Sequence, residues 1–204
     1  MTQKIVVATG NAGKLREIAR ALKGEPFDIV SQKTLGVDDA IEDGLSFVEN
    51  ALIKARHATL ATGLPAIADD SGLEVECLDG QPGIYSARYA GEGSTDTQNN
   101  QKLLETLDHR LKEHPIARFQ CVIVFMRHAE DPVPLICQGS WEGYITDNIE
   151  GQQGFGYDPL FYVPDQQCTA AQLSLELKNQ ISHRGKALNQ FIQLLKDSPV
   201  SFPK

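Results

Sequence analysis

The first thirty residues contain the pattern that most limits how this chain can fold. Residues 4–9 (KIVVAT) form a short β-branched run that is typical of a buried strand. The turn Gly10-Asn11-Ala12-Gly13 follows at once, and residues 14–22 then repeat apolar side chains at helical spacing. A second strand is expected at residues 27–31. This order predicts an α/β protein with a mixed central sheet flanked by helices.

The rest of the chain continues in the same style, with turn residues between short apolar runs. Capping boxes predict helices that begin after Ser46 and after Thr95. The remaining elements are predicted from periodicity: short strands at 66–68 and 73–77 around a polar corner, strands at 117–126 and 135–139 joined as a hairpin, a strand at 160–163, a helix of about ten residues from Thr169 and a terminal helix after Ser182.

Length and composition set the general class. The chain has 204 residues and a net charge of −8, and its four cysteines include no CxxC pair. At about 150 residues per domain, this length suits one large domain or a core with a smaller lobe. The cysteines are interpreted as reduced packing thiols. The acidic balance argues against nucleic acid as a partner, because such binders need a broad basic face.

Hydropathy argues against a membrane protein. No apolar run approaches the roughly 20 residues that span a bilayer. The first residues, MTQKIVVATG, also lack the apolar region of a secretory signal. We therefore expect a cytoplasmic protein with no membrane partner.

The turn after the first strand is the first candidate site. Thr9, Gly10, Asn11, Ala12, Gly13 and Lys14 lie where a helix N-terminus follows a strand, and such a position favours phosphate binding. Glycines allow close approach of the backbone, and Lys14 adds a positive charge. The spacing is not that of a Walker loop or a GxGxxG motif. An ordinary strand-to-helix turn is the alternative.

Two adjacent aspartates form the second candidate. Asp69-Asp70-Ser71-Gly72 follows an apolar run, and neighbouring carboxylates at such a position favour a bound cation. Ligands that are all oxygen indicate Mg²⁺, which keeps several waters and bridges to substrate phosphates. Glu42 and Asp39 could complete the site. An Asx-type turn with solvated aspartates is the alternative.

Two further candidates lie in the last third of the chain. Lys178 and the run Ser182-His183-Arg184-Gly185-Lys186 place cations at a helix start, where an anionic ligand would offset their conflict with the helix dipole. In Gly154-Phe155-Gly156-Tyr157-Asp158-Pro159, an aromatic ring between glycines could stack on a base, and Asp158 could accept hydrogen bonds from it. A solvated basic end and a turn with core aromatics are the respective alternatives.

Taken together, these motifs resemble the inosine triphosphate pyrophosphatase family, in its bacterial dITP/XTP pyrophosphatase branch. The resemblance runs almost end to end. It rests on five stretches in a specific order: Thr9-Gly10-Asn11-x-x-Lys14, Ala68-Asp69-Asp70-Ser71-Gly72, Pro82 to Arg88, Phe155-Gly156-Tyr157-Asp158 and Ser182-His183-Arg184. It implies a single domain over residues 1–204, with two lobes and a cleft between them.

The resemblance also implies an activity and roles for the residues. The activity is Mg²⁺-dependent hydrolysis of ITP, dITP and XTP to the monophosphate and pyrophosphate, by a homodimer that clears deaminated purines. Asp70 would be the proton acceptor and a metal ligand, with Asp69 and Glu42 as further ligands, although isoleucine precedes Glu42 where the family often has a second acid. The residues implied to contact the substrate are Thr9, Gly10, Asn11, Ala12, Gly13, Lys14, Ser71, Phe155, Gly156, Tyr157, Asp158, Lys178, His183 and Arg184.

Two other functions compete with this one on the residues alone. A nucleotide sensor without turnover would have a phosphate loop and a stacking ring but would not need Asp69 and Asp70. A phosphatase for smaller phosphoesters would not need the loop around Phe155.

Overall fold

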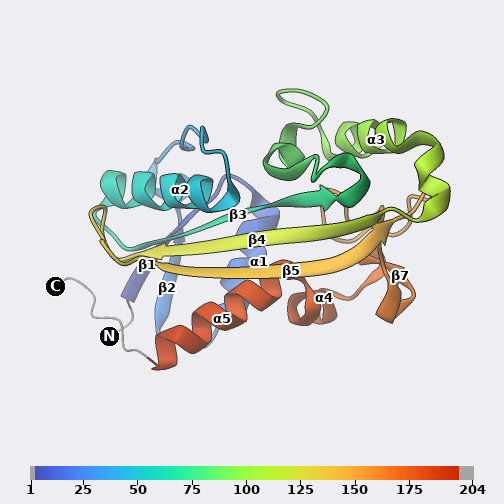
Figure 1. The fold of residues 1–204 in the computed structure, drawn as a ribbon. Coiled ribbons are helices and arrows are strands. Elements are labelled where there is room, and N and C mark those ends of the chain that lie inside the picture. The colour runs from blue at the N-terminus through green and yellow to red at the C-terminus, as the bar shows by residue number, and fades with distance from the viewer. Residues whose placement is uncertain (1–2, 198–204) are drawn as a thin grey trace. The chain divides into compact units, whose positions relative to one another are not determined.

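The computed structural model describes residues 3–197, so both ends of the predicted 1–204 domain lie outside the described residues. The α-helices and strands, in chain order, are β1 (Gln3–Ala8), α1 (Ala12–Ala21), β2 (Phe27–Ser31), α2 (Phe47–Thr62), β3 (Ala66–Val75), α3 (Asp96–Leu107), β4 (Ile116–Met126), β5 (Leu135–Ile145), β6 (Phe161–Val163), β7 (Cys168–Thr169), α4 (Leu175–Ile181) and α5 (His183–Asp197) (Figure 1).

The strands form one mixed sheet. Their order is β2-β1-β3-β4-β5-β6-β7. β1 runs parallel to both of its neighbours, β2 and β3, whereas β6 runs antiparallel to β5 and β7. The predicted class, an α/β protein with a mixed sheet flanked by helices, is therefore confirmed.

The chain divides into two compact units, each assembled from segments that are distant in sequence. Among the described residues, unit 1 consists of residues 3–70, 121–139 and 184–197. Unit 2 consists of Ser71–Gln120 and Ser140–His183. The strands β3, β4 and β5 each contribute residues to both units.

Unit 1 has a core on each face of its strands, because side chains alternate between faces along a strand. Ile5 and Val7 of β1 pack in one cluster with residues of α1 and α5, including Ile18 and Phe191. The intervening residues Val6 and Ala8 pack instead with the alanines on the inner face of α2, which lies on the other side of these strands (Figure 1). The buried run in β1 thus has apolar partners on both sides.

Unit 2 has a single cluster around aromatic side chains. Trp141, Phe119 and Phe161 lie at its centre, with the ring centroids of Phe119 and Phe161 4.6 Å apart. Leu103 and Leu107 of α3 pack against the same cluster. The capping box predicted for α3 is present, with Thr95 and Gln98 each bonding the other's backbone N–H.

Two predicted elements were wrong. The expected polar corner at residues 69–72 does not exist, because β3 continues through it as one strand. The aspartates do not force a turn, since cations lie beside both carboxylates within the fold. The predicted ten-residue helix from Thr169 is also broken. A short 3₁₀ turn ends at Gln172, and Ser174 then caps α4 by accepting a hydrogen bond from the Leu177 N–H.

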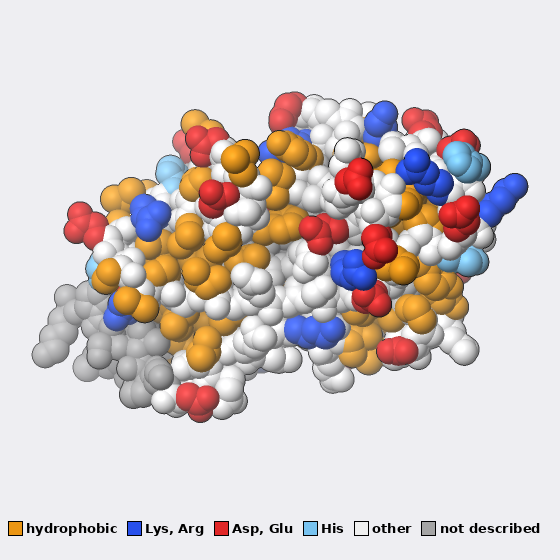
Figure 2. Space-filling view, in the orientation of Figure 1, with side chains coloured by type: hydrophobic (Ala, Val, Ile, Leu, Met, Phe, Trp, Pro, Cys, Tyr) orange, Lys and Arg blue, Asp and Glu red, His pale blue; other side chains and the backbone are white. Residues whose placement is uncertain are grey.

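The turn of the hairpin formed by β4 and β5 is part of unit 1. Residues 121–139, which include the turn, belong to unit 1, and Val122, Val124 and Met126 pack in the same cluster as Val6. In residues 3–197, no helix is both long and apolar enough to cross a membrane. On the face drawn in Figure 2, Lys and Arg side chains are scattered among acidic and apolar ones.

Candidate active site

The predicted phosphate loop lies in unit 1 between β1 and α1. Asn11 is the N-cap of α1, and its Oδ1 accepts hydrogen bonds from the N–H groups of Gly13 (2.8 Å) and Lys14 (3.0 Å). The Thr9 hydroxyl accepts another from the Asn11 N–H at 3.1 Å. Three of the backbone N–H groups in the predicted phosphate loop are therefore already bonded to side chains, which shapes the loop before any ligand binds.

Gly10 leaves room in this loop for a neighbouring carboxylate. A Cβ at this position would lie 2.5 Å from the Asp39 carboxylate, so Asp39 would have to move to admit a larger residue. The loop is also held from outside, because Lys33 Nζ donates to the Gly10 carbonyl at 3.1 Å.

Asp69 lies at the centre of a buried ionic network in unit 1. Its Oδ1 is 2.6 Å from Lys14 Nζ, and its Oδ2 accepts hydrogen bonds from Arg184 Nε (2.9 Å) and the Cys121 thiol (3.0 Å). Arg184 also pairs with Glu17, three residues after Lys14 on α1. Burial alone would raise the pKa of Asp69, but Arg184 and Lys14 lower that pKa well below its usual range.

Asp70 has a different environment. Its Oδ1 is 2.6 Å from Lys54 Nζ, and the same ammonium is 3.0 Å from Glu42 Oε2. Burial raises the pKa of Asp70, with Glu42 adding to the rise and the Lys54 and Lys14 charges opposing it. Consecutive carboxylates with opposite pKa shifts are typical of an acid–base site, in which one carboxylate stays ionised and the other takes up a proton.

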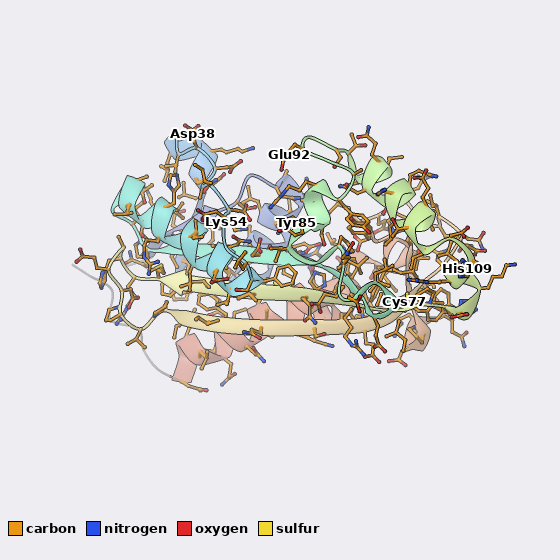
Figure 3. All side chains as sticks on the ribbon, turned by 45° about the horizontal axis from the view of Figure 1, so that its top comes forward. Asp38, Lys54, Cys77, Tyr85, Glu92 and His109 are labelled. Carbon is orange, nitrogen blue, oxygen red and sulfur yellow. The ribbon has the colours of Figure 1, made fainter. Side chains whose placement is uncertain are left out.

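Lys54 was not among the residues predicted from sequence. It extends from α2, where Figure 3 labels it, and its side chain is 11% exposed. A signal for it was present: residue 54 is three after Ala51 and four before Ala58, so it shares the inward face of the helix. Glu17 was also not among the residues predicted from sequence, although it lies three residues after Lys14 and is buried on α1.

The donor groups of unit 1 can be compared with the needs of Mg²⁺. Among residues 3–197, no three His, Cys, Asp or Glu side chains lie close enough together to hold a metal. Mg²⁺ is commonly held by only one or two carboxylates, together with waters and substrate phosphates. Asp70 and Glu42, which already share one cation, fit that requirement. Asp69 stays a predicted ligand, but both of its oxygens bond to other side chains.

The aromatic loop, defined here as Gly154–Asp158, lies in unit 2. The Phe155 N–H donates to Asp158 Oδ2 at 2.8 Å, and Lys178 Nζ of α4 lies 2.5 Å from the same oxygen. The Lys178 ammonium is also 5.2 Å from the centroid of the Phe155 ring. Phe155 is half-buried, as a ring that stacks on a base would be, whereas Tyr157 is a core residue. The predicted stacking ring therefore suits Phe155, and the alternative of a core aromatic describes Tyr157.

Lys178, His183 and Arg184 are buried, which neither sequence interpretation foresaw, whereas Lys186 is exposed. Lys178 and His183 belong to unit 2, and Arg184 belongs to unit 1. The His183 ring stacks on Phe119, with centroids 4.8 Å apart and planes 14° apart. Carboxylates of the protein itself balance Lys178 and Arg184, so the conflict with the helix dipole is relieved inside the fold. Ser71 is half-buried at the start of unit 2.

Comparison with known proteins identifies the family. The model of the Ham1 family matches residues 5–194. The chain belongs to the Ham1 family. A relative from Shigella flexneri named dITP/XTP pyrophosphatase is 59% identical over 195 residues, which are 96% of this chain and 99% of the relative. The protein of the same name from Escherichia coli K12 is 57% identical over the same shares of both chains.

Solved structures of Ham1 proteins have the same fold. The Coxiella burnetii Ham1 protein superposes with a TM-score of 0.89 at 48% identity, covering 97% of this chain and all of its own. The Staphylococcus aureus Ham1 protein gives a TM-score of 0.83 at 41% identity, covering 96% of this chain and 99% of its own. The resemblance inferred from the sequence motifs is thus confirmed at the level of family and fold.

Proposed function

We propose that this Ham1-family protein hydrolyses deaminated, noncanonical purine nucleoside triphosphates (dITP, ITP and XTP) to the monophosphate and pyrophosphate. The names of its relatives support this activity. The observation that carries it is the pairing of Asp70 with Lys54 and Glu42, beside an Asp69 with the opposite pKa shift. A sensor that only binds nucleotides would have no use for this arrangement.

We assign the phosphate chemistry to unit 1. Lys14 and the Thr9–Lys14 loop would bind the phosphates, and Lys54 would add a second positive charge. Asp70 would accept the proton of the attacking water, for which a raised carboxyl pKa is favourable at neutral pH. Asp69 would hold Lys14 and Arg184 in place rather than meet the substrate.

We further propose that Asp70 and Glu42 hold Mg²⁺ during the reaction, because their carboxylates are oxygen donors of the kind this ion prefers. When bound, the ion would offset charge on the phosphates. The protein groups would still have to bind the substrate, orient it and take up the proton.

We assign base recognition to unit 2. A purine would stack on the face of Phe155 that the Lys178 ammonium, 5.2 Å from the ring centroid, does not cover. A backbone N–H donor aimed at position 6 of that base would favour O6 of hypoxanthine or xanthine and disfavour the 6-amino group of adenine, because two opposed donors would both lack partners. Asp158 would keep Lys178 oriented through its ion pair.

Product analysis tests the proposal. The protein is incubated with ITP, dITP, XTP, ATP or GTP, each with and without Mg²⁺, and the products are separated by ion-exchange chromatography. We expect IMP and pyrophosphate from ITP, little turnover of ATP, and loss of activity when EDTA replaces Mg²⁺. Formation of IDP and orthophosphate would refute the assigned cleavage.

We also propose that the enzyme acts as a homodimer in the cytoplasm. The dimer is implied by the family resemblance, and the location follows from the nucleotide pool that it would clear. Light scattering after size-exclusion chromatography tests for the dimer, since a monomer would have a mass of 22.4 kDa. Cell fractionation tests the cytoplasmic location.

A further inference from the structure

Two side chains of helix α3 form hydrogen bonds to Gly156 of the aromatic loop. The Gly156 N–H donates to Asp96 Oδ2 at 2.7 Å, and the Gly156 carbonyl accepts a hydrogen bond from Asn100 Nδ2 at 3.1 Å. Asp96 and Asn100 are four residues apart and therefore lie on the same face of the helix. Both backbone polar groups of one loop residue are thus bonded to one helix face within unit 2.

We propose that Asp96 and Asn100 are positioning residues that hold the aromatic loop in the conformation that presents Phe155 to a purine base. The inference rests on the proposed function, since it assumes that Phe155 stacks on the substrate. Neither residue is expected to touch the nucleotide. They act through the backbone of the residue that follows the ring.

The contacts of the neighbouring residues show why Gly156 is the point that needs support. Phe155 is held through its N–H by Asp158, and Tyr157 is held through its hydroxyl, which donates to the Ser86 carbonyl at 2.9 Å. Gly156 lies between them with φ of +62°. A glycine in a loop is the residue with the most conformational freedom to lose. Fixing it in advance reduces the entropy lost when a base binds.

The bonding of Asn100 argues against a purely stabilising role. The side chain is 5% exposed, and its Oδ1 has no hydrogen-bond partner among the described residues. A buried acceptor without a partner costs free energy of folding, so the amide is a poor choice for stability alone. Its donor bond to Gly156 is the contact that a smaller or apolar residue could not replace.

The preceding residue provides a matched comparison. Asn99 is 3% exposed on the same helix, but its Oδ1 accepts from the Ala90 N–H and the Ser94 hydroxyl, and its Nδ2 donates to the Ala87 carbonyl. Asn99 therefore supports the segment before α3. The side-chain amide of Asn99 thus holds the segment before α3, whereas that of Asn100 holds the aromatic loop.

The test uses four variants of the full chain. Asp96→Ala and Asn100→Ala each remove one bond to Gly156. Asp96→Asn removes the same charge from the helix N-terminus but keeps an acceptor, and Asn99→Ala removes a buried amide that does not contact the aromatic loop. The measurements are kcat and KM for ITP, the inhibition constant of inorganic tripolyphosphate, and hydrogen–deuterium exchange of residues 154–158.

We expect Asp96→Ala and Asn100→Ala to raise KM for ITP about five- to tenfold with little change in kcat, as lost ground-state binding does. Inhibition by tripolyphosphate, which has no base, should stay unchanged, and exchange of residues 154–158 should become faster. Asp96→Asn should restore a KM close to that of the wild type. Asn99→Ala should leave KM unchanged even if it lowers the melting temperature.

Three results would overturn the inference: an unchanged KM for ITP in both alanine variants, an equal loss of ITP and tripolyphosphate binding, or the same rise in KM in Asn99→Ala. Failure of the proposed function is distinguishable, because it would appear as wild-type protein that does not convert ITP to IMP and pyrophosphate. In that event, calorimetric affinities of the same variants for ITP would still decide whether the clamp on Gly156 supports nucleotide binding.

Discussion

Asp69 and Asp70 are consecutive in β3, yet their carboxylates bind different lysines: Lys14 of α1 lies 2.6 Å from Asp69, and Lys54 of α2 lies 2.6 Å from Asp70. Successive side chains of a strand point to opposite faces of the sheet. One acidic pair in the sequence is therefore divided between two helices that cover opposite faces. The division gives the two carboxylates separate environments and opposite pKa shifts.

The first prediction concerns Asp70. Asp70→Asn should reduce kcat for ITP roughly 10²- to 10⁴-fold, the usual contribution of a positioned general base. Binding of ITP, measured by calorimetry without turnover, should persist because Lys14 and Lys54 remain. Unchanged turnover would remove Asp70 from the mechanism.

Asp69→Asn is predicted to act on folding instead. The substitution removes the ion-pair partner of Lys14 and one of the two carboxylates beside Arg184, which keeps Glu17, and breaking such a buried network costs about 3–5 kcal/mol. The free energy of unfolding in urea is measured for Asp69→Asn and for Asp70→Asn. Asp70→Asn should lose less stability, because Lys54 keeps Glu42 as a partner. Equal stability losses in the two variants would contradict the separate roles.

Lys14→Ala should mainly raise KM for ITP, by about tenfold, because Lys14 anchors phosphate in the ground state and in the transition state alike. Lys23→Ala serves as the control, since it removes an exposed lysine just beyond the other end of α1. Steady-state kinetics on both proteins measure the difference. A fall in kcat with unchanged KM would instead assign Lys14 to the transition state.

Gly154 is predicted to be irreplaceable because of Asp158. A Cβ at Gly154 would lie 2.0 Å from Asp158 Oδ2, whereas one at Gly93 would meet nothing within 4 Å. Both glycines have positive φ (+81° and +74°), so alanine is strained at either position. Gly154→Ala should therefore weaken ITP binding at least about fivefold more than Gly93→Ala does. Similar affinities in the two variants would show that the aromatic loop tolerates displacement of Asp158.

The turn between β4 and β5 should make stability depend on pH through Asp131. Its buried carboxylate accepts hydrogen bonds from the backbone N–H of Arg127 (3.0 Å), from Arg127 Nε (2.9 Å) and from the Val133 N–H (3.1 Å). The bond from the Arg127 side chain is the main reason why the pKa of Asp131 lies far below its ordinary value. Because the pKa is lowered on folding, this stabilisation is present above the unfolded-state pKa of about 4 and is lost as the pH falls towards the native pKa.

Asp131→Asn should accordingly lower the free energy of unfolding at pH 7 by about 1–3 kcal/mol, and the difference from the wild type should shrink below about pH 4. Urea unfolding at several pH values measures both. Asp147→Asn, at an exposed aspartate, controls for the general effect of charge. A difference that is constant with pH would exclude the carboxylate as its source.

Much of the fold could be predicted because its signals are local. The strand of residues 27–31 and the helices capped by Ser46 and Thr95 follow from β-branched runs and from side chains that bond backbone only three residues away. The elements that were predicted wrongly depend instead on contacts between residues that are distant in sequence. The polar residues 69–72 look like a turn unless Lys14 and Lys54, more than ten residues away in sequence, are known to lie beside them.

The sequence by itself determined most of the helices and strands, the family and most of the residues proposed to bind the nucleotide, because these depend on short motifs and their order. Only the tertiary structure decided how the charged groups pair. It brought Lys54 to Asp70, committed Arg184 to Asp69 and Glu17, and set Asp96 and Asn100 against Gly156. Ion pairs and hydrogen bonds between distant segments depend on packing of the whole chain, and no local pattern encodes which partner a buried charge will find.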